Sequence, residues 1–202
     1  MAGKNLFTAN EVWKGGGYEL FIPAESSKDL CSLLKALWTF PSLDGCYLRQ
    51  DCDPANQPRV QPCKNGIEEH LYGLATLPNK NVIPCGSYVM DYAGEEDSPP
   101  AHWISFDLTM CALSTAYPVG AYPFGSMDNV SEWKTQVDSF LTEVARWIHG
   151  KMPFEFGLVG FGIDTASVSP ESIRANGIPN ERDAGILWDD GVELKWYPAA
   201  RP

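Results

Sequence analysis

The sequence predicts an α+β fold in which an antiparallel or mixed sheet is flanked by two main helices and ends in a C-terminal β-hairpin. Strand-like runs outnumber helical ones and do not alternate with them, which argues against a doubly wound parallel sheet. Helical spacing of apolar residues extends over only two long segments. The chain has 202 residues, enough for the single globular domain over residues 1–202 that we expect.

The first quarter of the chain predicts a strand, a helix and then a loop-rich segment. The run Tyr18–Ile22 is rich in strand-forming residues. Ser26 or Ser27 caps the following helix, whose apolar residues recur at i, i+3, i+4, i+7 and i+8 until Pro41 ends it. Residues 41–68 contain several prolines and predict a long loop with at most a short strand.

The middle of the chain predicts three strands, Leu71–Leu77, Ser87–Tyr92 and His102–Thr109. The third alternates most clearly, which places every second side chain on the same face. One face receives Ile104, Phe106 and Leu108, and the other receives Trp103, Ser105 and Asp107.

The last third predicts a long helix, a central strand and the hairpin. Ser131 begins the helix, which continues to about His149 with a buried apolar stripe. The almost continuous apolar run Phe154–Ile163 suits a strand buried on both faces. An Asp-Gly turn then joins the strands Gly185–Trp188 and Val192–Tyr197.

The net charge and the length of the apolar stretches limit which classes of partner are expected. The formal net charge is −11, so phosphate backbones repel the chain and nucleic acid is not an expected ligand. No stretch approaches the ~18 apolar residues of a membrane-spanning helix, so no membrane partner is expected. No apolar leader follows Met1, and the six cysteines lack CxxC spacing. We therefore expect reduced thiols and a cytoplasmic location.

The acidic residues are unevenly distributed along the sequence. The interval from Asn81 to Trp133 contains no Lys or Arg and supplies −7 of the −11 charge. An aromatic Pro/Gly-rich loop at 117–128 lies within it, and aromatic anchors beside charge are typical of protein interfaces. The predicted partner-binding residues are Asp91, Glu95, Glu96, Asp97, Tyr117, Tyr122, Phe124 and Asp128. The alternative is that the acids only confer solubility and the three aromatic side chains fold inward.

The chain resembles the immunity proteins of bacterial toxin systems, which are compact, acidic, Trp-rich single domains. The resemblance is carried by the stretches His70–Gly73, 102–108 (HWISFDL), the helix at 131–149, 154–163 (FEFGLVGFGI) and 194–198 (LKWYP). It implies that the chain neutralises a cognate toxin by direct stoichiometric contact. The expected partner is a basic protein, because opposite charges accelerate association.

Two other classes of function stay open. A small hydrolase or transferase could use Cys85 or a carboxylate together with His70 or His102. Paired carboxylates for glycoside chemistry also stay open, although no pair stands out among 26 acidic residues. An adaptor subunit is the third alternative. The nucleotide-binding and hydrolase motifs of known enzymes are absent, so no cofactor is expected.

A metal site in the loop-rich segment is a minority hypothesis. Cys46, Cys52 and Cys63 could bind zinc, with Asp51, Asp53 or His70 as a further ligand. Structural zinc sites usually contain a closely spaced cysteine pair, and none is present here. A disulfide within the same segment is an alternative, and the prediction is that no metal binds.

Overall fold

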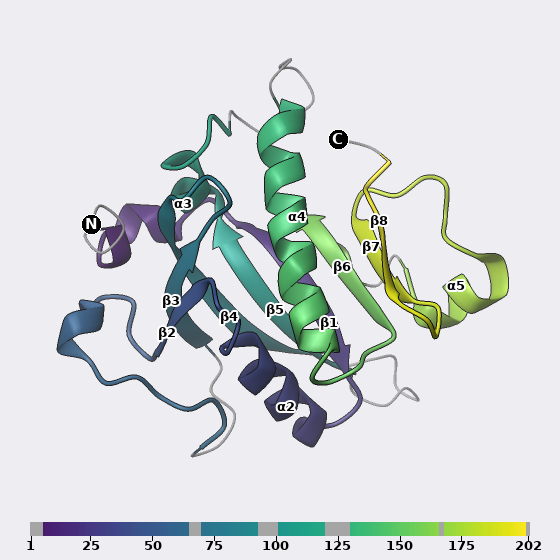
Figure 1. Cartoon of the computed structure of the whole chain (residues 1–202), viewed down its shortest axis with the longest axis horizontal. Coiled ribbons are helices and arrows are strands. Elements are labelled where there is room, and N and C mark those ends of the chain that lie inside the picture. Colours follow the sequence, from purple (N-terminus) through teal and green to yellow (C-terminus); the bar gives the residue numbers. More distant parts are fainter. Residues whose placement is uncertain (1–5, 65–69, 93–100, 120–129, 166–167, 201–202) are drawn as a thin grey trace.

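The protein forms one eight-stranded sheet with its helices arranged around it (Figure 1). The computed structural model describes residues 6–64, 70–92, 101–119, 130–165 and 168–200. The strand order is β2-β3-β4-β5-β1-β6-β7-β8, and each of these neighbouring pairs is antiparallel. The strands are β1 (Gly17–Ala24), β2 (Leu43–Tyr47), β3 (His70–Thr76), β4 (Val82–Tyr92), β5 (Ala101–Thr109), β6 (Phe156–Phe161), β7 (Gly185–Asp189) and β8 (Leu194–Tyr197). The predicted α+β class is confirmed, and the sheet is antiparallel.

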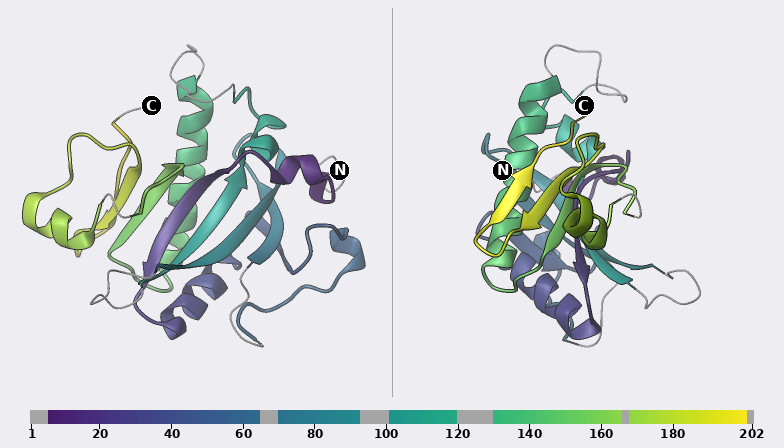
Figure 2. Two further views of the ribbon diagram at one scale, coloured as in Figure 1. Left: turned by 180° about the vertical axis from the view of Figure 1, so that it is seen from behind. Right: turned by 90° about the vertical axis from the view of Figure 1, so that its right-hand side faces the viewer.

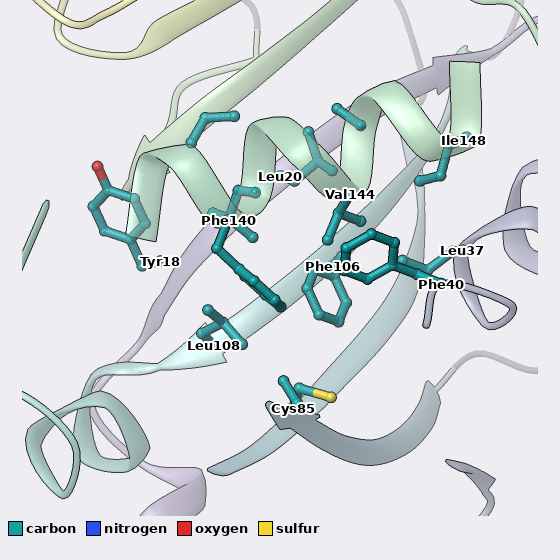
Figure 3. Packing of buried hydrophobic residues seen from close by; sticks show 14 of the residues in the cluster. Tyr18, Leu20, Leu37, Phe40, Cys85, Phe106, Leu108, Phe140, Val144 and Ile148 are labelled. Atoms are coloured by element: carbon teal, nitrogen blue, oxygen red, sulfur yellow. The ribbon is translucent and has the colours of Figure 1, made fainter. Parts of the chain in front are cut away.

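Two long helices, α2 (Ser27–Leu37) and α4 (Val130–His149), lie on the same face of the sheet (Figures 1 and 2). Ser26 caps α2 as predicted, because its hydroxyl accepts a hydrogen bond from the Asp29 amide. Both helices turn their apolar stripes toward the strands and form the main core (Figure 3). That core also receives Ile104, Phe106 and Leu108 from β5, so the predicted alternation of this strand is confirmed.

Among the described residues, the opposite face of the sheet, called the open face below, is covered at its two ends. At one end, α5 (Pro170–Asn176) places Ile173 in a second apolar cluster with Phe21 and Trp103. At the other end, the 3-10 helix η1 (Asn10–Trp13) and the residues before it pack on β2 and β3. The centre of β4, β5 and β1 lies between these two covers (Figure 2, left).

The C-terminal hairpin is confirmed, since β7 and β8 pair in register with a turn between them. Gly185 is required where it stands. A Cβ atom at this position would lie 1.8 Å from Cη2 of Trp196. The Trp196 indole of β8 therefore packs directly on the backbone of Gly185 in β7, where the last two strands of the sheet meet.

The start of strand β4 and the helix α3 differ from the sequence prediction. Strand β4 begins at Val82, five residues before the predicted Ser87, because Pro84 and Gly86 interrupt the strand-like pattern without ending the pairing with β3. The short helix α3 (Met110–Ser114) was not predicted. It directly follows β5, and the Thr109 hydroxyl caps it by accepting from the Ala112 amide.

The expectation that all six thiols are reduced is wrong for two of them. Cys31 in α2 and Cys63 in the loop-rich segment form a disulfide with Cα atoms 5.8 Å apart. The sequence could not reveal this pair, because the two residues are 32 positions apart and meet only when the loop folds back on α2. No helix in the described ranges has the length and apolar character needed to cross a bilayer.

Candidate functional site

Two carboxylates lie side by side at the centre of the open face. Glu19 of β1 and Asp107 of β5 occupy directly opposite positions in neighbouring antiparallel strands. Residues so placed have Cβ atoms about 4.5–5.5 Å apart and share a face of the sheet. Both residues line a hollow of about 400 Å³, which falls within the size range of small-ligand pockets.

Glycines on the adjoining strands make room for the two carboxylates. Gly86 of β4 is paired with Asp107, and Gly160 of β6 is paired with Glu19, so a glycine stands at each end of the acidic pair. A Cβ atom on Gly86 would lie 2.6 Å from Oδ1 of Asp107. A Cβ atom on Gly17, on the same face two residues before Glu19, would lie 2.8 Å from Cγ of Glu19. Side chains at these positions would fill the space that the carboxylates occupy.

Glu19 is buried and is held by two hydroxyl groups. Its Oε1 accepts hydrogen bonds from the Tyr88 hydroxyl and, at 3.3 Å, from the Ser105 hydroxyl. Burial raises the pKa of Glu19, and the two hydrogen bonds partly oppose the increase because they stabilise the anion. The Tyr88 pKa is also raised, first by burial and then by its bond to Glu19. The proton therefore stays on the phenol.

Asp107 has a strongly perturbed acidity. Burial raises its pKa from 3.8 to about 7, and the neighbouring Glu19 charge adds to the increase. Protein surrounds the carboxyl almost completely, yet the side chain keeps partial exposure where it lines the hollow. Near neutral pH this residue can therefore take up or release a proton with little cost.

Aromatic side chains form a wall beside the carboxylates. The exposed ring of His70 stacks on Tyr72 and on Tyr88, with centroids 6.3 and 5.6 Å apart. The indole of Trp13 meets Tyr72 edge-on at 5.2 Å. These rings lie on the open face where β3 and β4 adjoin the Asp107 position. Aromatic faces are favourable neighbours for a cation.

The hollow is the middle of a longer groove. A second depression, lined by His70 and Tyr72, shares Trp13, Tyr88 and Asp107 with the hollow. A third depression, beside α5, shares Phe161 and Gly162 with it. The three depressions adjoin one another in a row across β3, β4, β5, β1 and β6, and together they are called the open-face groove below.

No cation balances the two carboxylates within the hollow. Neither Lys nor Arg is among its lining residues or among those of the depression at His70. The ion pairs found in the described ranges involve other acids, such as Asp44 with Arg59 and Glu155 with Arg174. The described residues also contain no group of three or more His, Cys, Asp or Glu that could hold a metal ion. The arrangement is suited to receiving a cationic group from outside the chain.

Comparison with family models, curated proteins and solved structures found no match. The geometry of the groove is therefore the basis for assigning it a function.

Most of the predicted partner-binding residues lie outside the described residues. These are Glu95, Glu96, Asp97, Tyr122, Phe124 and Asp128, and the side chain of Asp91 is likewise not described. Tyr117 is 8% exposed, packs in the main core and donates a hydrogen bond to Gln136. At this residue the inward-folding alternative describes the structure, because the ring is covered on the α4 side of the sheet.

The cation-free interval does not place its described acids on one surface. Asp107 lies on the open face, whereas Glu132 is exposed on α4, which covers the opposite face. Asp107 therefore finds its acidic neighbour not within the interval but in Glu19, 88 positions earlier in the chain.

The proposed cysteine chemistry has an unfavourable geometry. Cys85 is 0% exposed in the main core, and burial raises the pKa of its thiol, the reverse of what a thiolate nucleophile requires. His70 lies on the other face of the sheet. His102 pairs with Asp91, whereas Gly86 beside Cys85 pairs with Asp107. His102 and Asp107 are five residues apart, which corresponds to about 17 Å along the strand.

Sequence reasoning missed Glu19 and did not single out Asp107. Each lies within a strand as one of many acids, and pairing them requires the register of β1 against β5. One signal was present in the sequence: an acid on the polar face of a well-alternating strand, at Asp107, in the part of the chain without cations.

Proposed function

We propose that the chain is a binding protein that holds a cationic group of a protein partner in the open-face groove, and that this partner is a toxin neutralised by direct contact. The observation that carries the proposal is the pairing of Glu19 with Asp107 in a hollow whose lining contains no Lys or Arg. The resemblance of the sequence to immunity proteins supports the same function from an independent direction.

The energetics of the pair favour an external cation. Two negative charges about 5 Å apart repel by roughly 3 kcal/mol at an effective dielectric constant of 20. The chain avoids this repulsion by keeping a proton on the pair near neutral pH, as the pKa of Asp107 of about 7 indicates. A bound guanidinium or ammonium group would replace the proton and convert repulsion into attraction.

The overall charge of the chain suits a basic partner. The formal net charge of −11 accelerates encounter with a positively charged protein and disfavours acidic ones. The hollow supplies the short-range contact, and the net charge supplies the long-range steering.

The test uses the protein encoded directly beside this chain as the candidate toxin. Its association with the wild type, with Asp107→Asn and with Glu143→Gln is measured by biolayer interferometry. Glu143 is exposed on α4, on the opposite face, so its variant removes the same charge away from the groove. We expect Asp107→Asn to weaken binding at least tenfold and Glu143→Gln to change it less than twofold.

Equal effects of the two variants would refute the groove as the contact site. Failure of the wild type to bind the neighbouring product, or to relieve its toxicity when the two are co-expressed, would refute the immunity function. Asp107→Asn is isosteric and removes a buried charge, so a loss of binding is not expected to reflect unfolding.

A carboxylate-based hydrolase is the second candidate, favoured by one observation. A carboxyl group with a pKa of about 7 beside a second carboxylate has the properties of a general acid and its partner. Turnover of a panel of aryl glycosides and esters by the wild type, abolished in Asp107→Asn, would support it. No turnover above that of the variant would exclude it for those substrates.

The cytoplasmic location stays a prediction. The disulfide between Cys31 and Cys63 bears on it, because reducing compartments keep such pairs open. Thiol labelling of the protein extracted under acid quench would determine whether the pair is oxidised in the cell.

A further inference from the structure

We infer that the open-face groove receives an extended segment of the partner, about six residues long, whose central arginine side chain enters between Glu19 and Asp107. The inference rests on the proposed function and names the group that the groove recognises. The inference is based on the length of the groove, the order of the residues along it, and the carboxylates and aromatic rings that line it.

The groove runs across the strands. From β3 to β6 it passes over four inter-strand spacings of about 4.8 Å, which gives a length of about 19 Å. An extended chain advances about 3.3 Å per residue, so about six residues fill this length.

The row of paired residues along the groove places the acids at its centre. In the order of the strands it reads Tyr72, Gly86, Asp107, Glu19 and Gly160. The acids stand in the middle of this row between Gly86 and Gly160, so no side chain at the adjoining positions of β4 and β6 separates them from a partner. An extended segment would therefore place its basic residue near its own centre.

Arginine fits this floor better than lysine. The guanidinium group is planar and presents several N–H donors, so one group can bond two carboxylates at once. The rings of Trp13, Tyr72 and Tyr88 provide aromatic surfaces beside the acids, and guanidinium groups stack on such surfaces. Lysine offers a compact charge without either property.

The probe is the synthetic peptide acetyl-Gly-Ser-Gly-Arg-Ser-Gly-amide, with one counterpart in which citrulline replaces arginine and another in which lysine does. Citrulline keeps the shape and removes the charge. Binding to the full chain is followed by ¹H–¹⁵N NMR, in which the amides of Gly17, Gly86 and Gly162 report on binding because these glycines line the groove. N-acetyl-arginine-amide tests the contribution of the extended segment.

We expect the arginine peptide to bind at least tenfold more tightly than the citrulline and lysine peptides and than N-acetyl-arginine-amide. We also expect the arginine peptide to shift the resonances of the three glycine amides. Its affinity should be at least tenfold lower for Asp107→Asn than for the wild type, and unchanged for Glu143→Gln. Equal binding of the arginine and citrulline peptides, or shifts confined to other residues, would overturn the inference.

The outcomes separate the inference from the function on which it rests. One outcome is that Asp107→Asn weakens binding of the protein partner, while the arginine peptide does not change the chemical shifts of the glycine amides. The groove then binds the partner through a different group, so the inference fails and the proposed function does not. If the peptide binds as expected but the partner is insensitive to Asp107→Asn, the proposed function fails and the arginine site stands.

Discussion

Replacing Asp107 with asparagine is expected to stabilise the protein, by an amount that grows as the pH rises from about 4 to above 7. In the folded chain the pKa of Asp107 is raised from 3.8 to about 7, mainly by burial. Between these two values the folded state holds a proton that the unfolded state has released. The stability associated with this carboxyl is therefore fully present below about pH 4 and is lost as the pH rises through 7.

The size of the effect follows from the same pair of values. The difference between 3.8 and about 7 is about three pH units, and each corresponds to 1.36 kcal/mol, so the cost of ionising Asp107 in the fold is at most about 4 kcal/mol. Water at the mouth of the hollow screens part of this cost, since the side chain is partly exposed. We expect Asp107→Asn to gain about 2–4 kcal/mol over the wild type at pH 8.5 and at most about 1 kcal/mol at pH 4.5.

The assay is urea-induced unfolding of the wild type, Asp107→Asn and Glu143→Gln, followed by tryptophan fluorescence at several pH values between 4.5 and 8.5. Equal slopes of unfolding free energy against urea concentration would show that the variants unfold from equally compact states. Glu143→Gln controls for the removal of one negative charge from a chain of net charge −11. A stability difference between Asp107→Asn and the wild type that does not grow with pH would refute the reasoning, as would a variant less stable than the wild type at pH 8.5.

Three further outcomes are expected. Binding of the arginine peptide should be about tenfold weaker at pH 6 than at pH 8, because Asp107, with its pKa of about 7, is mostly protonated at pH 6. Titration calorimetry at both pH values measures the affinity, and an affinity that does not depend on pH would contradict this expectation. Removing the disulfide by Cys31→Ser with Cys63→Ser should lower the free energy of unfolding by about 3–4 kcal/mol, because the bond closes a loop between residues 32 positions apart. An unchanged urea midpoint would show that other contacts hold the loop. Gly185→Ala should lower the melting temperature, with a cost of about 2–3 kcal/mol, because the added Cβ displaces the Trp196 ring; calorimetry showing wild-type stability would mean that the indole moves freely.

The sequence by itself determined the elements and their faces. Periodicity is a local property, so the helical stripe after Ser26, the alternation of Ile104, Phe106 and Leu108, and the Asp-Gly hairpin could be read before any contact was known. These patterns also predicted that Asp107 lies on the opposite face of its strand from Ile104, Phe106 and Leu108. They failed where local signals were interrupted, as at the start of β4, because Pro84 and Gly86 disfavour a strand that the neighbouring strands nevertheless hold in place.

Only the tertiary structure decided which residues form the site. Glu19 meets Asp107 through the register of two strands far apart in the sequence, and the same sheet order brings Gly86 and Gly160 to either side of them. The acidity of Asp107 follows from that assembly, since burial and a neighbouring charge act on a carboxyl only once the chain has folded around it. The sequence supplied the charge, and strand pairing created the hollow that makes it useful for binding.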